Sequence, residues 1–174
     1  MKVVSSYGVE IKKQNIPIRH TLYIYRQAVG YLIRVYEESW EELSRIVNLQ
    51  KRFNAAEHLV HSTKKNRARY DFDQRFPKMP SYLRRSAIQH ALGSVSSYET
   101  RLELWKQKKL AGKPKLVYEN HAMPVFYRDV MYKEAEDQAD IAFLKLYDGR
   151  DWKWFPVNLL HTDMEYLRKN WAGV

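Results

Sequence analysis

The sequence predicts an α+β protein in which a helical bundle is inserted between β elements of a small barrel or sheet subdomain. A short β-prone segment comes first (residues 2–11), helical patterns fill the middle, and β-prone aromatic runs follow from residue 125. The β elements at the two ends must meet to bury an apolar face, so the helices between them form an insertion. The expected boundaries are 1–16 for the first β element, 17–112 for the helical part, and 113–174 for the remaining β elements with a short terminal helix.

The segment 80–105 has the clearest helical periodicity in the chain. Its apolar residues recur at steps of three, four or seven, which places them on one stripe of an α-helix: Leu83, Ala87, Ala91, Tyr98, Leu102 and Trp105. Ser81 is the expected N-cap of this helix and Gly112 its expected C-terminal stop.

Two more helices are expected before this one. The first runs from about residue 18 to residue 47, and Gly30 inside it indicates a close helix–helix contact, because glycine is otherwise unfavourable there. The second runs from about 49 to 61, and the polar, proline-containing stretch 62–80 that follows is expected to be a loop.

The C-terminal third has β character. Residues 125–132 are β-prone, and the acidic stretch 133–140 is expected to be an exposed turn. Residues 141–147 and 152–157 flank Asp148-Gly149 and predict a β-hairpin. Thr162 or Asp163 is the expected cap of a final helix through Trp171.

The composition predicts a folded, soluble protein of the cytoplasm. The chain has 174 residues, of which 45% are hydrophobic and 14% aromatic, and this content argues against disorder. No run approaches the roughly 18 apolar residues of a membrane span, and we expect no secretory signal at the start. Because there is no cysteine, a disulfide scaffold and a thiolate metal site are excluded.

The positive charge is concentrated in two segments. The formal net charge is +10, yet residues 51–85 alone contribute +7 and residues 106–115 contribute five lysines without an acid. A concentrated excess of this kind is typical of a protein that binds a polyanion. A basic surface exposed to solvent, without a specific ligand, is the alternative.

Within the first segment, cations alternate with aromatic residues. Phosphate contact combined with base stacking would explain this mixture, and aromatic anchors that hold the loop on the core would explain it equally well. The residues concerned are Lys64, Lys65, Arg67, Arg69 and Arg75 with Tyr70, Phe72 and Phe76. Arg84 and Arg85 lie in the first turn of the next helix, where the helix dipole disfavours cations; either they meet an anionic partner or they reach solvent.

No catalytic constellation is visible in the sequence. His58 and His61 share a helix face, but without a third ligand they are expected to be surface residues rather than a metal site. The acidic stretch 133–140 lacks the fixed geometry of a two-metal nuclease, and no phosphate-binding loop or nucleophile motif occurs. We expect no enzyme activity, no cofactor and no metal.

Four passages together resemble the N-terminal part of the TnpB family, the transposon-encoded RNA-guided nucleases related to type V CRISPR effectors. The order and spacing of the passages create the likeness, which spans nearly the whole chain. They are YRQAVGYLIRVYEESW (25–40), PSYLRRSAIQHALGSVSSYETRLELW (80–105), GKPKLVYENHAMPVFYRDVMYK (112–133) and AFLKLYDGRDWKWFPVNL (142–159).

The resemblance implies a wedge domain with an oligonucleotide-binding-like barrel, complete or partial within this chain, and an inserted helical recognition lobe. In that family the two parts grip the guide RNA and its hybrid with DNA. The family's RuvC-like domain and cysteine zinc ribbon have no counterpart in these residues, so no cleavage is expected from this chain alone.

The expected function is therefore that of a nucleic-acid-binding module for guide RNA or an RNA–DNA hybrid. The alternative is a protein-interaction subunit that completes its β domain with a partner chain carrying the nuclease, or with a second copy of itself; no membrane partner is expected. The candidate contacts are the two basic segments and the hairpin tryptophans: Lys64, Lys65, Arg67, Arg69, Tyr70, Arg75, Arg84, Arg85, Lys106, Lys108, Lys109, Lys113, Lys115, Trp152 and Trp154. A buried role is expected for one of the two tryptophans.

Overall fold

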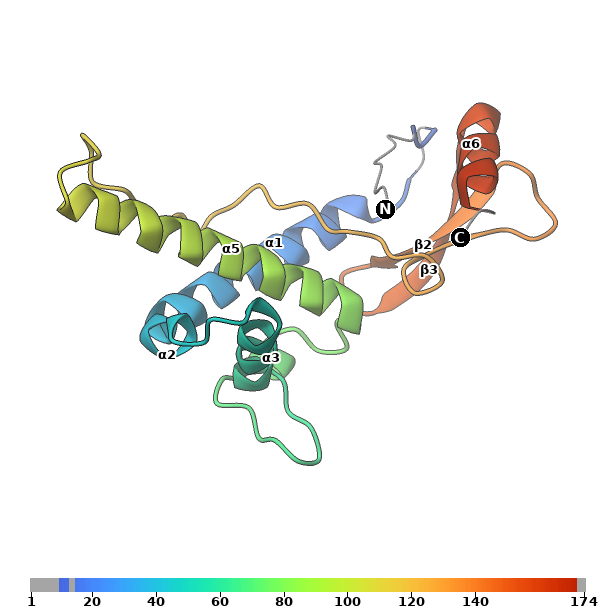
Figure 1. The fold of residues 1–174 in the computed structure, drawn as a ribbon. Coiled ribbons are helices and arrows are strands. Elements are labelled where there is room, and N and C mark those ends of the chain that lie inside the picture. The colour runs from blue at the N-terminus through green and yellow to red at the C-terminus, as the bar shows by residue number, and fades with distance from the viewer. Residues whose placement is uncertain (1–9, 13–14, 172–174) are drawn as a thin grey trace. The chain divides into compact units, whose positions relative to one another are not determined.

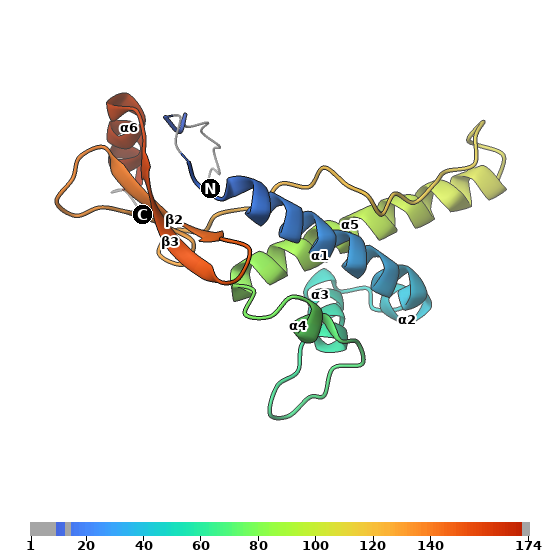
Figure 2. The same cartoon turned by 180° about the vertical axis from the view of Figure 1, so that it is seen from behind.

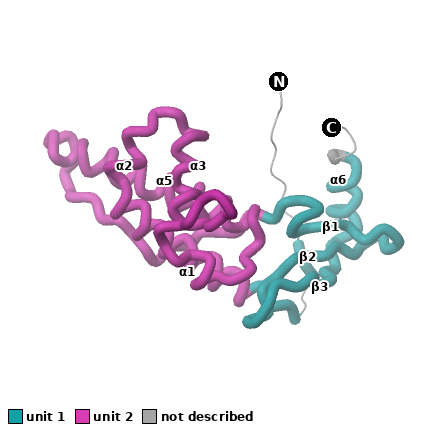
Figure 3. The backbone as a smooth tube through the Cα atoms, turned by 90° about the horizontal axis from the view of Figure 1, so that it is seen from below, with its two compact units in different colours: residues 1–18, 126–174 teal, residues 19–125 magenta. Residues whose placement is uncertain are grey.

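A computed structural model describes residues 10–12 and 15–171. The chain forms two compact units, one made of residues 1–18 and 126–174 and the other of residues 19–125 (Figure 3). The first contains the β-sheet and the second is helical, so the predicted α+β class is confirmed. Within the described residues, no helix is long and apolar enough to span a membrane.

Five helices build the helical unit (Figure 1). Helix α5 packs against α3, and α1 is joined to both of them through buried tyrosines. Tyr25 of α1 shares a hydrogen bond of 2.9 Å with Ser86 of α5, and Tyr36 donates one to the Ala56 carbonyl of α3. The helices are α1 (Ile18–Glu38), α2 (Trp40–Ser44), α3 (Leu49–Val60), α4 (Phe72–Arg75) and α5 (Ser81–Lys106).

The first predicted helix is shorter than expected. It ends at Glu38, because Ser39 leaves the helical conformation with φ −97° and ψ 9°. The buried Ser39 hydroxyl shares a hydrogen bond with the Tyr70 hydroxyl, while the Ser39 amide still donates to the Val35 carbonyl. The chain resumes as the short α2, so residues 18–47 form two helices with a break rather than one.

Both predicted caps of α5 are wrong. Pro80 occupies the N-cap position in an extended conformation, so Ser81 is the first helical residue and its side chain caps nothing. At the other end the helix stops at Lys106, and Lys108 takes the left-handed conformation with φ 60°. A lysine therefore takes the place that glycine usually fills, and Gly112 lies six residues beyond the helix end.

An extended segment at residues 113–125 lies along α1. Asn120 donates a side-chain hydrogen bond to the Arg26 carbonyl, and Arg26 in turn donates to the Ala122 carbonyl. A Cβ at Gly30 would lie 2.6 Å from the Tyr118 carbonyl oxygen. Gly30 therefore does mark a close approach, but the neighbour is this extended segment and not the helix that the sequence predicted.

The sheet unit contains an antiparallel sheet in the order β1-β2-β3. The strands are β1 (Tyr132–Glu134), β2 (Ile141–Tyr147) and β3 (Trp152–Asn158), so the predicted hairpin is confirmed. Asp148 closes its turn by accepting hydrogen bonds from the backbone amides of Arg150 and Asp151, both 2.8 Å long. An ion pair with Lys153 and these two bonds hold the pKa of the Asp148 carboxyl well below its usual range.

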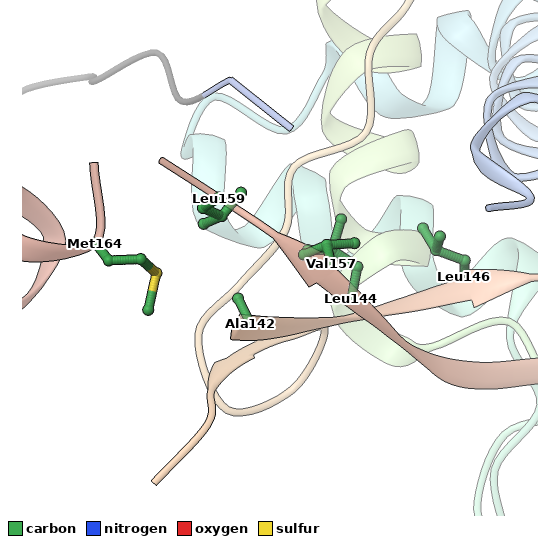
Figure 4. Packing of buried hydrophobic residues seen from close by; sticks show 6 residues of the cluster. All are labelled: Ala142, Leu144, Leu146, Val157, Leu159 and Met164. Carbon is green, nitrogen blue, oxygen red and sulfur yellow. The ribbon is translucent and has the colours of Figure 1, made fainter. Parts of the chain in front are cut away.

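The inner face of this sheet forms the core of the unit. Alternate side chains of β2 pack with residues from β3, from the chain after it and from α6 (His161–Trp171), as Figure 4 shows. The buried residues of this cluster are Ala142, Leu144, Leu146, Val157, Leu159 and Met164. The strict alternation along β2 leaves the side chains in between on the outer face.

Three expectations for this unit fail or fall outside the described residues. Residues 125–131 are irregular, and only 132–134 join the sheet as β1. Helix α6 begins at His161, so Thr162 and Asp163 lie within it instead of capping it. Of the first predicted strand, residues 1–9 lie outside the described part, and Ile11 forms an isolated antiparallel bridge with Leu159.

Candidate nucleic-acid interface

A tight turn forms the end of the basic loop, which we define as residues 62–71 (Figure 2). The Thr63 hydroxyl accepts hydrogen bonds from the backbone amides of Lys65 and Asn66, and Thr63 and Asn66 pair as an isolated antiparallel bridge. The Asn66 side chain donates to the carbonyls of His58 and His61, at 2.9 and 3.2 Å, and so ties the turn to the end of α3. Lys64 and Lys65 thus lie at the two corners of a hydrogen-bonded turn.

The cations of the basic loop fall into two groups. Lys64, Lys65 and Arg67 are exposed, and within the described residues no carboxylate forms an ion pair with them. Arg69 lies 3.8 Å from Glu42 and is also exposed, so this pair is weak. The first three cations are the ones that an anionic ligand can reach without displacing a protein carboxylate.

The aromatic residues that follow hold the loop on the helical unit. Phe72 is fully buried and Phe76 is 8% exposed, and their rings lie 4.8 Å apart. Both pack against the ring of Tyr31, whose hydroxyl donates to Asp71. Burial, aided by this hydrogen bond to Asp71, raises the pKa of Tyr31 to about 12. The anchoring alternative is therefore correct for Phe72 and Phe76.

Tyr70 and Arg75 also have partners inside the helical unit. The Tyr70 ring lies under the Arg69 guanidinium at 5.5 Å, and its hydroxyl bonds to Ser39. Arg75 forms an ion pair of 3.0 Å with Asp71 and lies over the Tyr31 ring. Both side chains contribute to the base of the loop, and we leave them out of the proposed interface.

Arg84 and Arg85 both lie beside an anionic partner, but this partner belongs to the protein itself. Arg84 is buried, with 9% exposure, and lies 3.4 Å from Glu57 of α3. Arg85 lies 3.9 Å from the same carboxylate and stacks over the Phe53 ring. The anionic partner of this pair is thus Glu57, and both arginines stabilise the packing of α3 on α5. Their role as phosphate contacts is accordingly not proposed.

The lysine segment, residues 106–115, lies at the opposite end of α5 from the basic loop. All five of its lysines are exposed; Lys106 also lies 3.9 Å from Glu103, and Lys113 lies over the Trp105 ring at 5.6 Å. A helix of 26 residues spans about 39 Å. The basic loop and the lysine segment therefore form separate surfaces, and only an extended polyanion could touch both.

The outer face of the sheet combines lysines with aromatic rings. The pairing register places Lys133 of β1 beside Phe143 of β2, and Lys145 of β2 beside Trp154 of β3. The Lys133 ammonium lies 4.8 Å from the Trp154 ring centroid and 5.5 Å from that of Phe143. We call these four residues, Lys133, Phe143, Lys145 and Trp154, the aromatic face.

The two hairpin tryptophans differ in exposure. Trp152 is 9% exposed and packs against the Tyr147 ring at 5.3 Å, whereas Trp154 is partly exposed within the aromatic face. The expectation that one tryptophan is buried is confirmed. Sequence reasoning missed Lys133, Phe143 and Lys145, although the Asp-Gly turn fixes the hairpin register and places Phe143 and Lys145 of β2 on the same face as Trp154.

The histidine pair and the acidic residues form no site of their own. His61 bonds to Asp73 at 2.9 Å and His58 is exposed. His161 contacts Asp140 at 2.8 Å and Glu165 at 3.9 Å, all at the surface. In the part of the chain that the structure describes, no group of three or more histidine and acidic side chains is arranged to hold a metal ion.

Comparison with known proteins gives one match, to a family model. The family model of the Aq_aa04 family matches residues 5–148, which is most of the chain and includes the helical unit, β1 and β2. The chain belongs to the Aq_aa04 family. No curated protein and no solved structure matches the sequence or the fold of this Aq_aa04-family chain.

Proposed function

We propose that this protein is a nucleic-acid-binding module for structured RNA or an RNA–DNA hybrid, with no catalysis of its own. The observation that supports it best is the hydrogen-bonded turn that presents Lys64 and Lys65, with Arg67 beside it, without carboxylate partners among the described residues. Exposed lysines and arginines on a fixed backbone can contact phosphates, and such contacts add affinity by releasing counterions. The lysine segment at the other end of α5 supplies a second contact for an extended ligand.

The proposal includes the finer architecture that the TnpB resemblance implies. In it, the helical unit acts as a recognition lobe, and the three-stranded sheet belongs to an oligonucleotide-binding-like wedge barrel. One compact unit combines residues 15–18 with residues 126–171, and the helical residues lie between these two stretches in the sequence, which supports this assignment. Cleavage of nucleic acid is not part of this proposal.

Neutralising the turn tests the proposal. The triple variant Lys64→Gln, Lys65→Gln and Arg67→Gln is expected to bind a hairpin RNA more weakly and with a smaller salt dependence. The slope of log K against log salt is negative, and each lost phosphate contact makes it shallower by about 0.7–0.9. The triple variant should therefore have a slope that is shallower by about 2–3. Fluorescence anisotropy with a labelled RNA across a salt series measures both quantities.

A second triple variant controls for total charge. Lys12, Arg19 and Arg150 are exposed but lie outside both basic segments of the sequence. Their replacement with glutamine removes the same net charge and should leave the slope nearly unchanged. Equal slopes for the two variants would show that the turn has no special contact with the RNA.

A further inference from the structure

The outer face of the sheet does not have the composition of a solvated surface. An antiparallel sheet with one face on a core usually presents polar side chains on the other. Here the outward positions of the three strands include two lysines and no acidic residue, and most of the others are aromatic or apolar. They are Lys133, Ile141, Phe143, Lys145, Tyr147, Trp152, Trp154, Pro156 and Asn158.

Contacts within the aromatic face define a small platform. The Lys133 ammonium lies over both Phe143 and Trp154, and the Lys145 ammonium lies 5.9 Å from the Trp154 centroid. The rings of Phe143 and Trp154 come from adjacent strands, and both are only partly buried. The backbone of the platform is fixed, because the opposite side of the same strands packs into the core.

We propose that the aromatic face binds a single-stranded segment of the RNA by stacking bases on Trp154 and Phe143. Every base has a π-face, so aromatic side chains on a sheet hold unpaired bases without requiring a given sequence. Lys133 and Lys145 have flexible stems, and their ammonium groups can move from the rings to the flanking phosphates. The absence of acidic residues from the outward strand positions gives the charge complementarity that a phosphodiester strand needs.

This inference rests on the proposed function but adds a distinct requirement, which is that bases and not only phosphates are recognised. A duplex hides its base faces in the stack, so this surface should favour unpaired strands. Phosphate binding by the basic loop requires no bases. The two claims can therefore fail separately.

The test compares two labelled strands of equal charge, a 12-mer of uridines and an abasic 12-mer with the same backbone, by fluorescence anisotropy. The wild-type chain should bind the uridine strand more tightly than the abasic strand. Trp154→Leu should weaken uridine binding by about tenfold or more and leave abasic binding unchanged. Trp154→Phe keeps an aromatic ring and should retain most of the preference.

Lys153→Gln is the matched control, because Lys153 lies on the same strand but on the opposite face of the sheet. It should not alter the preference for bases. If the wild-type chain binds both strands equally well, or if Trp154→Leu and Trp154→Phe both keep the wild-type preference, the platform is ruled out while phosphate binding stands. If neither strand binds, and the hairpin RNA does not bind either, the proposed function itself fails.

Discussion

Replacing Glu57 with glutamine is expected to lower the free energy of unfolding by about 3 kcal/mol. Glu57 is the anionic partner of Arg84, whose side chain is only 11% exposed, and it also contacts Arg85. Glutamine keeps the shape but removes the charge, so a largely buried guanidinium loses its counter-charge, and breaking such a pair costs about 3–5 kcal/mol. Thermal unfolding followed by the helical circular dichroism signal should show a melting temperature lower by about 6–12 °C.

Two further variants separate this effect from a general loss of charge. Glu42→Gln removes an exposed carboxylate that lies 3.8 Å from Arg69, and it should cost less than about 1 kcal/mol. The double variant Glu57→Leu and Arg84→Met replaces the pair with apolar side chains and should recover most of the lost stability. A Glu57→Gln protein as stable as Glu42→Gln would contradict the structural role given to Arg84.

Gly30→Ala is expected to destabilise the helical unit, even though alanine is the better helix former. Its Cβ would lie 2.6 Å from the Tyr118 carbonyl oxygen, which belongs to the backbone of the extended segment. That segment is fixed by hydrogen bonds of Asn120 and Arg26, so relieving the clash must shift several contacts. An overpacking cost of about 1–3 kcal/mol exceeds the gain in helix propensity of about 1 kcal/mol.

Gly93→Ala provides the opposite case on α5. A Cβ at Gly93 would meet nothing within 4 Å, so only the helix-propensity term remains, and stability should rise by up to about 1 kcal/mol. Urea unfolding of both variants shows whether Gly30→Ala lowers the free energy of unfolding and Gly93→Ala raises it. A Gly30→Ala chain more stable than wild type would show that the 113–125 segment is not held on α1.

The local sequence pattern was sufficient to predict the helices with clear apolar periodicity and the hairpin with its Asp-Gly turn. The Asp-Gly turn between two aromatic runs predicted the hairpin, and apolar periodicity predicted α5 and most of α1. The ends of the helices were not predictable, because tertiary contacts decide them. Ser39, where the first helix breaks, bonds to Tyr70, which lies 31 residues away, and Lys108 takes the left-handed conformation in place of a glycine.

The residues of the candidate interface were also only partly predictable from the sequence. The sequence indicated Lys64, Lys65 and Arg67 through charge, but it gave equal grounds for Arg84 and Arg85, whose partner Glu57 lies on another helix. It indicated Trp154 as a stacking residue without its neighbours Lys133 and Phe143. Those three residues come from three strands, so only the sheet register brings them together.

Binding of the purified chain to four labelled ligands across a salt series tests the central claim most directly. The ligands are a hairpin RNA, an RNA–DNA hybrid, a DNA duplex of the same length, and a single strand. We expect the hairpin RNA and the hybrid to bind more tightly than the DNA duplex, with affinity that falls steeply as salt rises. Weak binding that is equal for every ligand would contradict the account, and would favour instead a subunit whose sheet edges pair with a partner chain.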